Sequence, residues 1–313
     1  MDNERRKDTS RRPLVIISGP TATGKTSLAV RLAKDIGGEI ISADSMQVYR
    51  YMDIGTAKVT KEEMQGVPHF MIDTVLPSEA FSIADYKTMA SACIRDIESR
   101  GNIPIVAGGT GFYIHALLYD TEFEETPGGG REREELTALA EEKGNAYLYE
   151  RLKEEDPEAA LTIHPNNIRR VIRALEYRML TGERISEHNR KQKEKDSPYD
   201  FLYFALNRER EALNEAIDRR VDRMMEAGLY EEVQKLLASG YGYDLVSMQG
   251  IGYKEFSGCT PAEAAEKIKL NSRHYAKRQV TWLKREKNVT WVEAPVKEED
   301  YRWIREQCMK LSE

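Results

Sequence analysis

The segment GPTATGKT, residues 19–26, has the residue types and the spacing of a loop that binds phosphate. Its glycines let the backbone curl so that several N–H groups point inward, and a following helix adds the positive end of its dipole. The Lys25 ammonium supplies a charge for phosphate oxygens, and the Thr26 hydroxyl suits Mg²⁺. The pattern therefore predicts a bound polyphosphate and magnesium, but it does not say whether the phosphate is transferred, cleaved or lost as a leaving group.

A carboxylate and a glycine-rich turn follow two other strand-like segments. Asp44 ends the segment 38–44, and GGTGFY, residues 108–113, ends an apolar run. Ligands of parallel α/β sheets bind outside the carboxyl ends of the strands, so Asp44 and Thr110 are expected near the phosphate loop. Asp44 there could orient magnesium or accept a proton from a nucleophile, although an aspartate in this position also serves as a helix cap.

The elements that must position these groups alternate between strand and helix patterns. This alternation predicts an α/β fold, with a P-loop-type, doubly wound parallel sheet as its core. Ser82 is the expected N-cap of one helix. The expected strands cover residues 13–19, 38–44, 103–113, 199–207 and 289–294, and the expected core helices cover 25–37, 81–101, 209–228, 229–239 and 261–287.

The pattern changes after about Tyr119, where an acidic, glycine-broken stretch leads into residues 131–195, which are almost entirely helical in pattern. We therefore predict two domains. The core comprises residues 1–120 and 199–313, including the C-terminal helices, and a helical insertion comprises residues 121–198. Within the insertion, Pro165 or Asn166 is expected to cap a helix.

The composition is that of a globular protein, with 313 residues of which 40 % are hydrophobic and 32 % charged. Cys93, Cys259 and Cys308 lie far apart, which argues against a disulfide framework and a zinc site. The first twelve residues are charged and predict a polar tail instead of a secretory signal, and no apolar stretch approaches the length of a membrane span. We expect a cytoplasmic protein with no membrane partner.

Two zones are rich in lysine and arginine although the formal net charge of the chain is −6. They are residues 166–195 and 267–287. Such zones suit contacts with nucleic-acid phosphates, whereas an isolated basic helix is more often a solvated face. We interpret Ile268, Tyr275 and Trp282, spaced seven apart, as core anchors and not as platforms for stacked bases.

Eight segments follow one another along the chain: GPTATGKT (19–26), SADSMQVYRYMDIGTAK (42–58), PHFMID (68–73), AGGTGFY (107–113), IHPNNIRRVIRALE (163–176), IDRRVDRMMEAGL (217–229), QGIGYKE (249–255) and YAKRQVTWLKR (275–285). Together and in this order they resemble the tRNA dimethylallyltransferase, or tRNA isopentenyltransferase, family. The resemblance runs in register from about residue 13 to residue 285, and the lack of a C-terminal zinc finger indicates the bacterial type. The chain departs from the family pattern at Thr23, Met46, Tyr51 and Val59, and Met46 puts one contact with RNA in doubt.

The resemblance implies transfer of a dimethylallyl group from dimethylallyl diphosphate to N6 of the adenosine adjacent, on the 3′ side, to the anticodon of tRNAs. Pyrophosphate would leave, held by the phosphate loop with Mg²⁺ bound at Thr26. Asp44 would be the catalytic base, and Arg220 would reach the diphosphate, although spacing alone does not exclude Arg219 or Arg223. The implied diphosphate-binding residues are Gly19, Pro20, Thr21, Ala22, Thr23, Gly24, Lys25 and Thr26.

The resemblance also implies an RNA-binding surface. The insertion 121–198 would grip the anticodon stem-loop, and the chain is expected to act as a monomer. The residues expected to contact tRNA are Asp44, Ser45, Met46, Gln47, Thr110, Asn166, Asn167, Ile168, Arg169, Arg170, Gln249, Gly250, Ile251, Gly252, Tyr253, Lys254, Lys277 and Arg278.

Other functions fit parts of the pattern. A small-molecule or nucleoside kinase would use the phosphate loop, Lys25 and Asp44 equally well. An adenylate isopentenyltransferase would keep the prenyl donor and use free AMP or ATP as acceptor. A non-enzymatic RNA-binding protein would leave GPTATGKT and Asp44 without a role. The segments after residue 160 and the two basic zones favour tRNA.

Overall fold

The computed structural model describes residues 11–121 and 130–311, and the side chains of residues 192–194 are outside this description. The expected polar tail therefore falls largely outside the described residues, as does most of the acidic, glycine-broken stretch between Tyr119 and residue 131. The chain divides into two compact units. Unit 1 comprises Met1–Leu118 and Pro198–Glu313, and unit 2 comprises Tyr119–Ser197.

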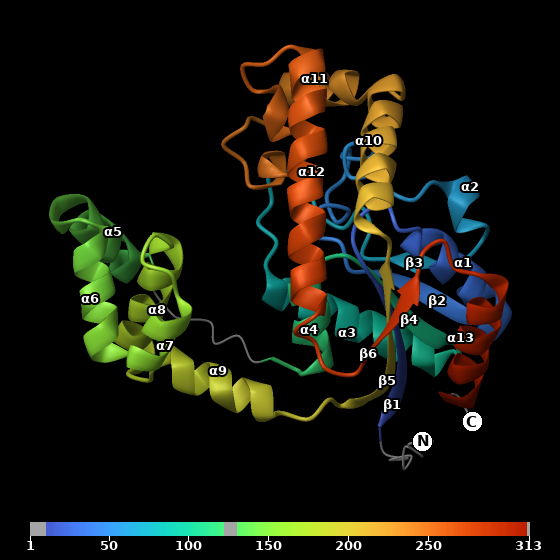
Figure 1. Ribbon diagram of the computed structural model, residues 1–313, viewed down its shortest axis with the longest axis horizontal. Coiled ribbons are helices and arrows are strands. Elements are labelled where there is room, and N and C mark those ends of the chain that lie inside the picture. The colour runs from blue at the N-terminus through green and yellow to red at the C-terminus, as the bar shows by residue number, and fades with distance from the viewer. Residues whose placement is uncertain (1–10, 122–129, 312–313) are drawn as a thin grey trace. The chain divides into compact units, whose positions relative to one another are not determined.

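Unit 1 is built on a six-stranded sheet in the order β3-β2-β4-β1-β5-β6 (Figure 1). Every pair of neighbouring strands is parallel, with Val15 opposite Ile105 on one side of β1 and Ile16 opposite Tyr203 on the other. The predicted parallel α/β fold is confirmed. The strands are β1 (Arg12–Ser18), β2 (Gly38–Ser42), β3 (His69–Phe70), β4 (Ile103–Gly108), β5 (Tyr199–Asn207) and β6 (Val289–Glu293).

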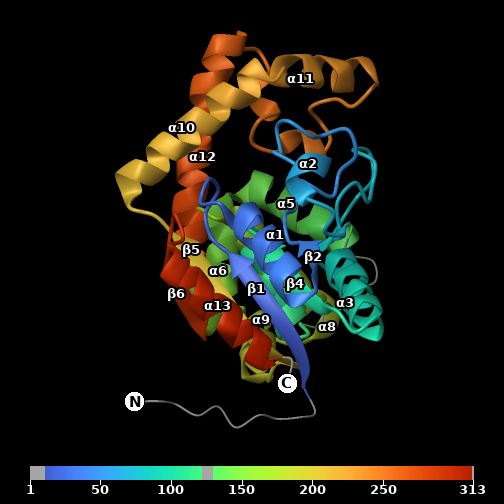
Figure 2. The same ribbon diagram turned by 90° about the vertical axis from the view of Figure 1, so that its right-hand side faces the viewer.

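Helices cover both faces of this sheet (Figure 2). On one face α1 and α13 pack together through a core that includes Leu32 and Ile304, both fully buried. On the other face α3 packs on β2 and β4. The helices of unit 1 are α1 (Lys25–Ile36), α2 (Lys61–Met64), α3 (Ile83–Ser99), α4 (Gly111–Leu118), α10 (Arg210–Glu226), α11 (Leu229–Ala238), α12 (Pro261–Leu283) and α13 (Glu298–Leu311), with the short 3₁₀ turns η1 (Ser247–Gln249) and η2 (Lys254–Phe256).

The ends of these helices follow from local chemistry. Ser82 caps α3 as expected: its side chain accepts from the Asp85 N–H while the Asp85 carboxylate accepts from the Ser82 N–H. Gly37 ends α1 in the left-handed conformation, with φ of 67°. Thr260 and Glu263 form the same reciprocal cap at the start of α12, where Pro261 occupies the first turn.

A second apolar core lies beyond the sheet, where α10 and α12 run side by side (Figures 1 and 2). It joins α10, α11 and α12 to the irregular segment 43–60 that follows β2. Val48 and Met52 of that segment are fully buried in it, together with Tyr253. This core fixes the segment that begins with Asp44, although the segment itself contains no helix and no strand longer than one bridge residue.

Unit 2 is a small helical bundle with its own core, which includes Leu136, Leu148 and Leu175. The expected cap of α8 is wrong: Asn167 is the N-cap and makes no side-chain hydrogen bond. The preceding turn is closed instead by His164, whose carbonyl accepts from the Asn167 N–H and whose ring nitrogen accepts from the Asn166 N–H. The helices are α5 (Arg131–Lys143), α6 (Asn145–Glu155), α7 (Pro157–Thr162), α8 (Ile168–Thr181) and α9 (Ile185–Glu194).

Within the described ranges, no helix is both long and apolar enough to cross a membrane.

The ends of the neighbouring strands β2 and β4 approach too closely for side chains. A Cβ on Gly108 would lie 2.2 Å from the Ala43 carbonyl oxygen. We therefore expect Gly108→Ala to lower the free energy of unfolding by about 1–3 kcal/mol, the usual cost of overpacking.

Thermal or denaturant unfolding measures this loss. Gly242→Ala is the matched control, because its only contact under 3 Å would be with the flexible end of Asp244. Equal stability of the two variants would contradict the close approach of the strands.

Candidate active site

The phosphate loop joins β1 to α1 and is held in a curled shape by its own backbone. Gly19, Ala22 and Gly24 have positive φ angles of 148°, 63° and 86°. Thr23 is buried and its hydroxyl donates to the Pro20 carbonyl at 2.8 Å. No side chain caps the start of α1, so its first N–H groups remain available to an anion.

Two distant helices support this loop from the side. Ala22 packs against Leu213 and Ile217 of α10 and Ala276 of α12. The side-chain amide of Gln279, on α12, accepts from the Thr21 N–H at 3.1 Å and donates to the Gly109 carbonyl at 2.9 Å. One buried amide thus joins the phosphate loop to the turn after β4.

Asp44 lies in the turn that follows β2, and its carboxylate accepts from the Met46 N–H at 2.9 Å. The pairing of β2 with β4 continues past the strand ends: the Ala43 carbonyl accepts from the Thr110 N–H, and the Thr110 hydroxyl accepts from the Ser45 N–H, each at 3.0 Å. The structure therefore brings Asp44, Ser45 and Thr110 together, as the order of strand ends predicts.

One cavity of about 410 Å³ collects these groups. The phosphate loop with Lys25 and Thr26, the turn 44–47, the turn at 107–109 and Arg220 form its polar side. Apolar side chains of α10 and α12 complete it, namely Ile217, Val221, Met224 and Ile268. A charged cradle, a carboxylate and an apolar wall therefore share one enclosure.

Electrostatics in this cavity favour an anion. Burial, together with the nearby Arg220 charge, lowers the pKa of Lys25 to about 7, while Asp44 opposes both effects. The Lys25 side-chain nitrogen donates to the Pro20 carbonyl at 2.7 Å. Burial also lowers the pKa of Arg220, and Asp44 again acts in the opposite direction. Because the Lys25 and Arg220 charges lie close enough to repel each other, a diphosphate placed between them would stabilise both.

The three candidate arginines of α10 lie in different places. Arg219 is exposed and pairs with Glu215, and Arg223 is exposed and donates to the Arg219 carbonyl. Only Arg220 of the three lines the cavity with Lys25 and Asp44. All three also line a second cavity of about 570 Å³ on the other side of the phosphate loop, together with Arg31 and Arg208.

The residues expected to contact RNA divide into several groups. Gln249, Gly250 and Ile251 line the cavity, as do residues 44–47. Gly252 and Tyr253 are buried, so the Tyr253 side chain is not available to RNA in this arrangement, and Lys254 is exposed. In unit 2, Ile168 is half-buried and its four neighbours are exposed, namely Asn166, Asn167, Arg169 and Arg170.

On α12, Lys277 and Arg278 are exposed, and the Arg278 guanidinium lies 5.5 Å from the centre of the Tyr275 ring. The interpretation of Ile268 as a core anchor is confirmed, since it is buried in the second apolar core. That of Tyr275 is wrong, since this side chain is only half-buried and lines the cavity. Burial raises the pKa of Tyr275 to about 12, with a further contribution from Asp44, so its hydroxyl stays protonated. It bonds with Thr110 and Gln279.

The sequence reading missed the contribution of Gln279. Tyr275, Arg278 and Gln279 are spaced as i, i+3 and i+4, which places them on one face of a helix. That spacing was the available signal. That this face of the helix points toward the cavity depends on how α12 packs, which the spacing alone does not show.

The oxygen groups present fit a magnesium ion that shares a diphosphate. Thr26 and Asp44 line the same cavity, and a hydroxyl and a carboxylate suit Mg²⁺ when phosphate oxygens and water supply the other ligands. No cluster of three or more His, Cys, Asp and Glu that could hold a metal occurs within the described residues. A metal at this site would therefore depend on the diphosphate for most of its ligands.

Comparison with known proteins gives a consistent result. The family model described as IPP transferase matches residues 47–286. A tRNA dimethylallyltransferase of Lachnoclostridium phytofermentans is 54 % identical over 285 residues, which cover 90 % of this chain and 91 % of that protein. A tRNA dimethylallyltransferase of Bacillus cytotoxicus is 48 % identical over 290 residues, with 91 % of each chain covered.

Solved structures agree. The full-length tRNA isopentenylpyrophosphate transferase of Bacillus halodurans is similar with a TM-score of 0.72 and 44 % identity, covering 96 % of this chain and 98 % of that one. A eukaryotic dimethylallyltransferase acting on tRNA is similar with a TM-score of 0.79 and 32 % identity, covering 90 % of this chain and 74 % of that one.

The lowered pKa of Lys25 predicts proton uptake when an anion binds. Above about pH 7 the free lysine is largely neutral, and a bound anion raises its pKa, so pyrophosphate binding near pH 8 should take up about one proton. Near pH 6 the lysine is already charged and no such uptake is expected.

Calorimetry without Mg²⁺, in buffers of different ionisation enthalpy, measures the uptake. Lys25→Arg is the control, because it keeps the charge at every pH and leaves the ligand's own protonation unchanged. An identical proton count for both proteins near pH 8 would refute the lowered pKa.

Proposed function

The chain belongs to the IPP transferase family, and we propose that it moves a dimethylallyl group from dimethylallyl diphosphate to N6 of the adenosine next to the anticodon, on its 3′ side. The enzyme is a prenyltransferase that modifies tRNA. The observation that carries the proposed chemistry is the cavity in which Lys25, Arg220 and Asp44 meet beside an apolar wall. The bond broken is between C1 of the prenyl group and the diphosphate oxygen, and the bond formed is between C1 and N6.

The acceptor needs help to react. The lone pair of an exocyclic adenine amine is delocalised into the ring, so the amine is a weak nucleophile until a base takes its proton. In the proposed mechanism Asp44 accepts that proton, and its carboxylate is oriented for this by the Met46 N–H. Thr110, one hydrogen bond away at Ser45, borders the position of the incoming base.

The donor needs charge stabilisation at its leaving group. As the C1–O bond breaks, negative charge grows on the diphosphate, and Lys25, Arg220 and the first N–H groups of α1 stabilise that charge. Mg²⁺ bound with Thr26 would supply further Lewis-acid stabilisation when present. Diphosphate leaves as pyrophosphate, so the phosphate loop acts as a cradle for a leaving group.

The apolar wall suits the prenyl group. Ile217, Val221, Met224 and Ile268 line the same cavity as the polar groups proposed to hold the diphosphate. A branched five-carbon chain gains about 25 cal/mol per Å² of apolar surface that it buries there. The same wall keeps water away from the allylic cation that develops at C1.

For the RNA, we propose contacts by Arg278 and Lys277 near the cavity and by Asn166, Asn167 and Arg170 of unit 2, which would grip the anticodon stem-loop. The target base must leave its stack to reach Asp44, because the cavity is enclosed by protein on several sides. We propose that the enzyme works in the cytoplasm, where its RNA substrate is made.

A labelling experiment tests the function. The protein is incubated with labelled dimethylallyl diphosphate and Mg²⁺, and with either tRNA or AMP. Label is expected in tRNA and not in AMP, and pyrophosphate is expected to appear with the same stoichiometry. Label in AMP would assign the chain to free-nucleotide prenylation, and no label in either acceptor would defeat the proposal.

In the same assay, Asp44→Ala should lower kcat by about 10²–10⁴-fold, the usual contribution of a general base, while tRNA affinity stays close to that of the wild type. Asp44→Asn should behave in the same way, because an amide cannot take the proton. Near-normal turnover of either variant would remove Asp44 from the role of base.

Arg278→Ala should weaken tRNA binding and reduce the slope of log K against log salt by about 1, as loss of one phosphate contact does. Arg302→Ala on α13 is the control: it removes the same charge from an exposed position that pairs with Glu298 and lines neither cavity. Equal slopes for the two variants would count against a phosphate contact at Arg278.

A further inference from the structure

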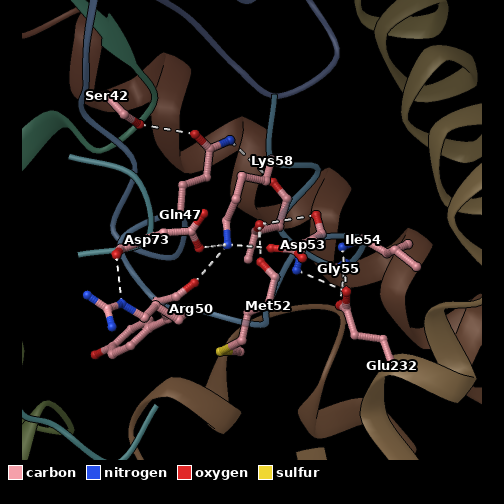
Figure 3. Close-up of polar contacts among 12 residues, drawn as sticks. Ser42, Gln47, Arg50, Met52, Asp53, Ile54, Gly55, Lys58, Asp73 and Glu232 are labelled. Atoms are coloured by element: carbon pink, nitrogen blue, oxygen red, sulfur yellow. Dashed lines mark hydrogen bonds and ion pairs between the residues drawn. The ribbon is translucent and has the colours of Figure 1, made fainter. Parts of the chain in front are cut away.

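One wall of the cavity is made of backbone without regular secondary structure. Residues 55–57 line the cavity, as do residues 44–47, and both groups belong to the irregular segment that follows β2. Such a segment has no continuous ladder of hydrogen bonds: backbone bonds tie residues 47–50 to residues 73–75, and side chains that bond to the segment add further support. Three distinct polar contacts supply that support (Figure 3).

The first is a carboxylate from a distant helix. Glu232, in the first turn of α11, accepts from the N–H groups of Asp53, Ile54 and Gly55 at 2.9, 2.7 and 3.1 Å (Figure 3). Consecutive backbone N–H groups that converge in this way form an anion-binding concavity, and here the anion belongs to the protein. The buried Tyr253 hydroxyl donates a fourth bond to the same carboxylate at 2.7 Å.

The second is a buried cation at the end of the segment. The Lys58 side chain is 4 % exposed, and its ammonium donates to the carboxylates of Asp53 and Asp73 at 2.5 and 2.6 Å and to the Tyr49 carbonyl at 2.8 Å (Figure 3). These bonds use all its donors. Asp53 is thus fixed from both sides, by Glu232 at its N–H and by Lys58 at its carboxylate.

The third contact links residues 55–57 to the turn that holds Asp44. The Gln47 amide accepts from the Ser42 hydroxyl at 3.0 Å and donates to the Ala57 carbonyl at 3.3 Å. The two parts of the wall are therefore joined across the segment. Neither Glu232 nor Lys58 lines the cavity itself.

The wall is packed tightly from behind. A Cβ on Gly55 would lie 2.5 Å from the Tyr253 ring, so this part of the backbone rests directly on the aromatic side chain. On the cavity side, residues 55–57 present only small groups, namely Gly55 and Ala57 with Thr56 between them. The larger apolar side chains Ile217, Val221 and Met224 line the same cavity, and Ala57 packs against the apolar cluster that contains Val221 and Met224. The position of residues 55–57 therefore affects the room left for the apolar part of the donor.

We propose that Glu232 is a positioning residue that fixes the wall at residues 55–57 and thereby restricts the donor to a short prenyl group. This inference rests on the proposed function. The Glu232 carboxylate lies outside the cavity, and by this inference it sets the size limit of the apolar subsite inside the cavity. With one acceptor lost, residues 55–57 would be held less firmly, and the cavity would yield to a longer prenyl chain.

Glu232→Gln tests this with little change of volume. The amide offers one acceptor oxygen and turns donors toward a backbone N–H, so at least one of the three N–H groups loses its partner. We expect kcat/KM for dimethylallyl diphosphate to fall about tenfold, and the ratio of kcat/KM for geranyl diphosphate to that for dimethylallyl diphosphate to rise at least about fivefold, with tRNA as acceptor.

Glu231→Gln is the matched control. It removes the same charge from the same turn of α11, but Glu231 is exposed and accepts no hydrogen bond within the described structure. Its two rate constants and their ratio should equal those of the wild type. A purely structural role for Glu232 would lower stability and both rates together and leave the ratio unchanged, and that result would overturn the proposal.

Should Glu232→Gln fail to fold, Tyr253→Phe replaces it. That variant keeps the ring under Gly55 and the three N–H bonds but removes the fourth bond to the carboxylate, so a smaller rise of the ratio is expected; an unchanged ratio would overturn the proposal. Wild-type protein that transfers neither prenyl group to tRNA defeats the proposed function, whereas a wild type that transfers and a variant with an unchanged ratio defeat this inference alone.

Discussion

Parallel pairing of β4 with both β1 and β2 decides where Lys25 and Asp44 lie in the cavity. The phosphate loop, the turn with Asp44 and the turn with Thr110 each follow one of these strands, so they emerge side by side at one edge of the sheet. The approach is closer than side chains permit, which is why glycine stands at position 108 against the Ala43 backbone. The strand order therefore decides which chemical groups meet at this edge of the sheet.

The cavity is built before its anion arrives. Lys25 and Arg220 are both drawn away from water and repel each other, and each is stabilised by Asp44 only in part. That arrangement costs the folded protein stability, and a bound diphosphate offsets the cost by supplying the missing negative charge. Binding energy from the diphosphate is thereby available to orient the prenyl carbon toward the acceptor.

Elements with strong local signals could be predicted from the sequence, and those that depend on distant packing could not. The phosphate loop, α1 and the Ser82 cap were predictable because glycine spacing, helical periodicity and capping chemistry are local. By contrast, β3 has two residues, α2 has four, and α4 is apolar around most of its surface, so none shows a clear period. The helix α13 was also not anticipated.

The same limit applies to the site. The motif predicted Lys25 and the strand end predicted Asp44, whereas Gln279 and Glu232 act on backbone groups at least 170 residues away in sequence. Nothing in the neighbourhood of either residue indicates such a partner. Tyr275 was mistaken for a core residue because its heptad spacing with Ile268 describes a face of α12 without saying what that face meets.

The helix α12 carries adjacent residues with different roles. Arg278 lines the cavity and is the proposed phosphate contact, and Gln279 bonds the Thr21 N–H of the phosphate loop. A helix is stiff over one residue, so under the proposed function a polyanion that displaces Arg278 would also displace the amide that supports the phosphate loop. Thermodynamic linkage would then require that tRNA change diphosphate binding by the same factor as diphosphate changes tRNA binding.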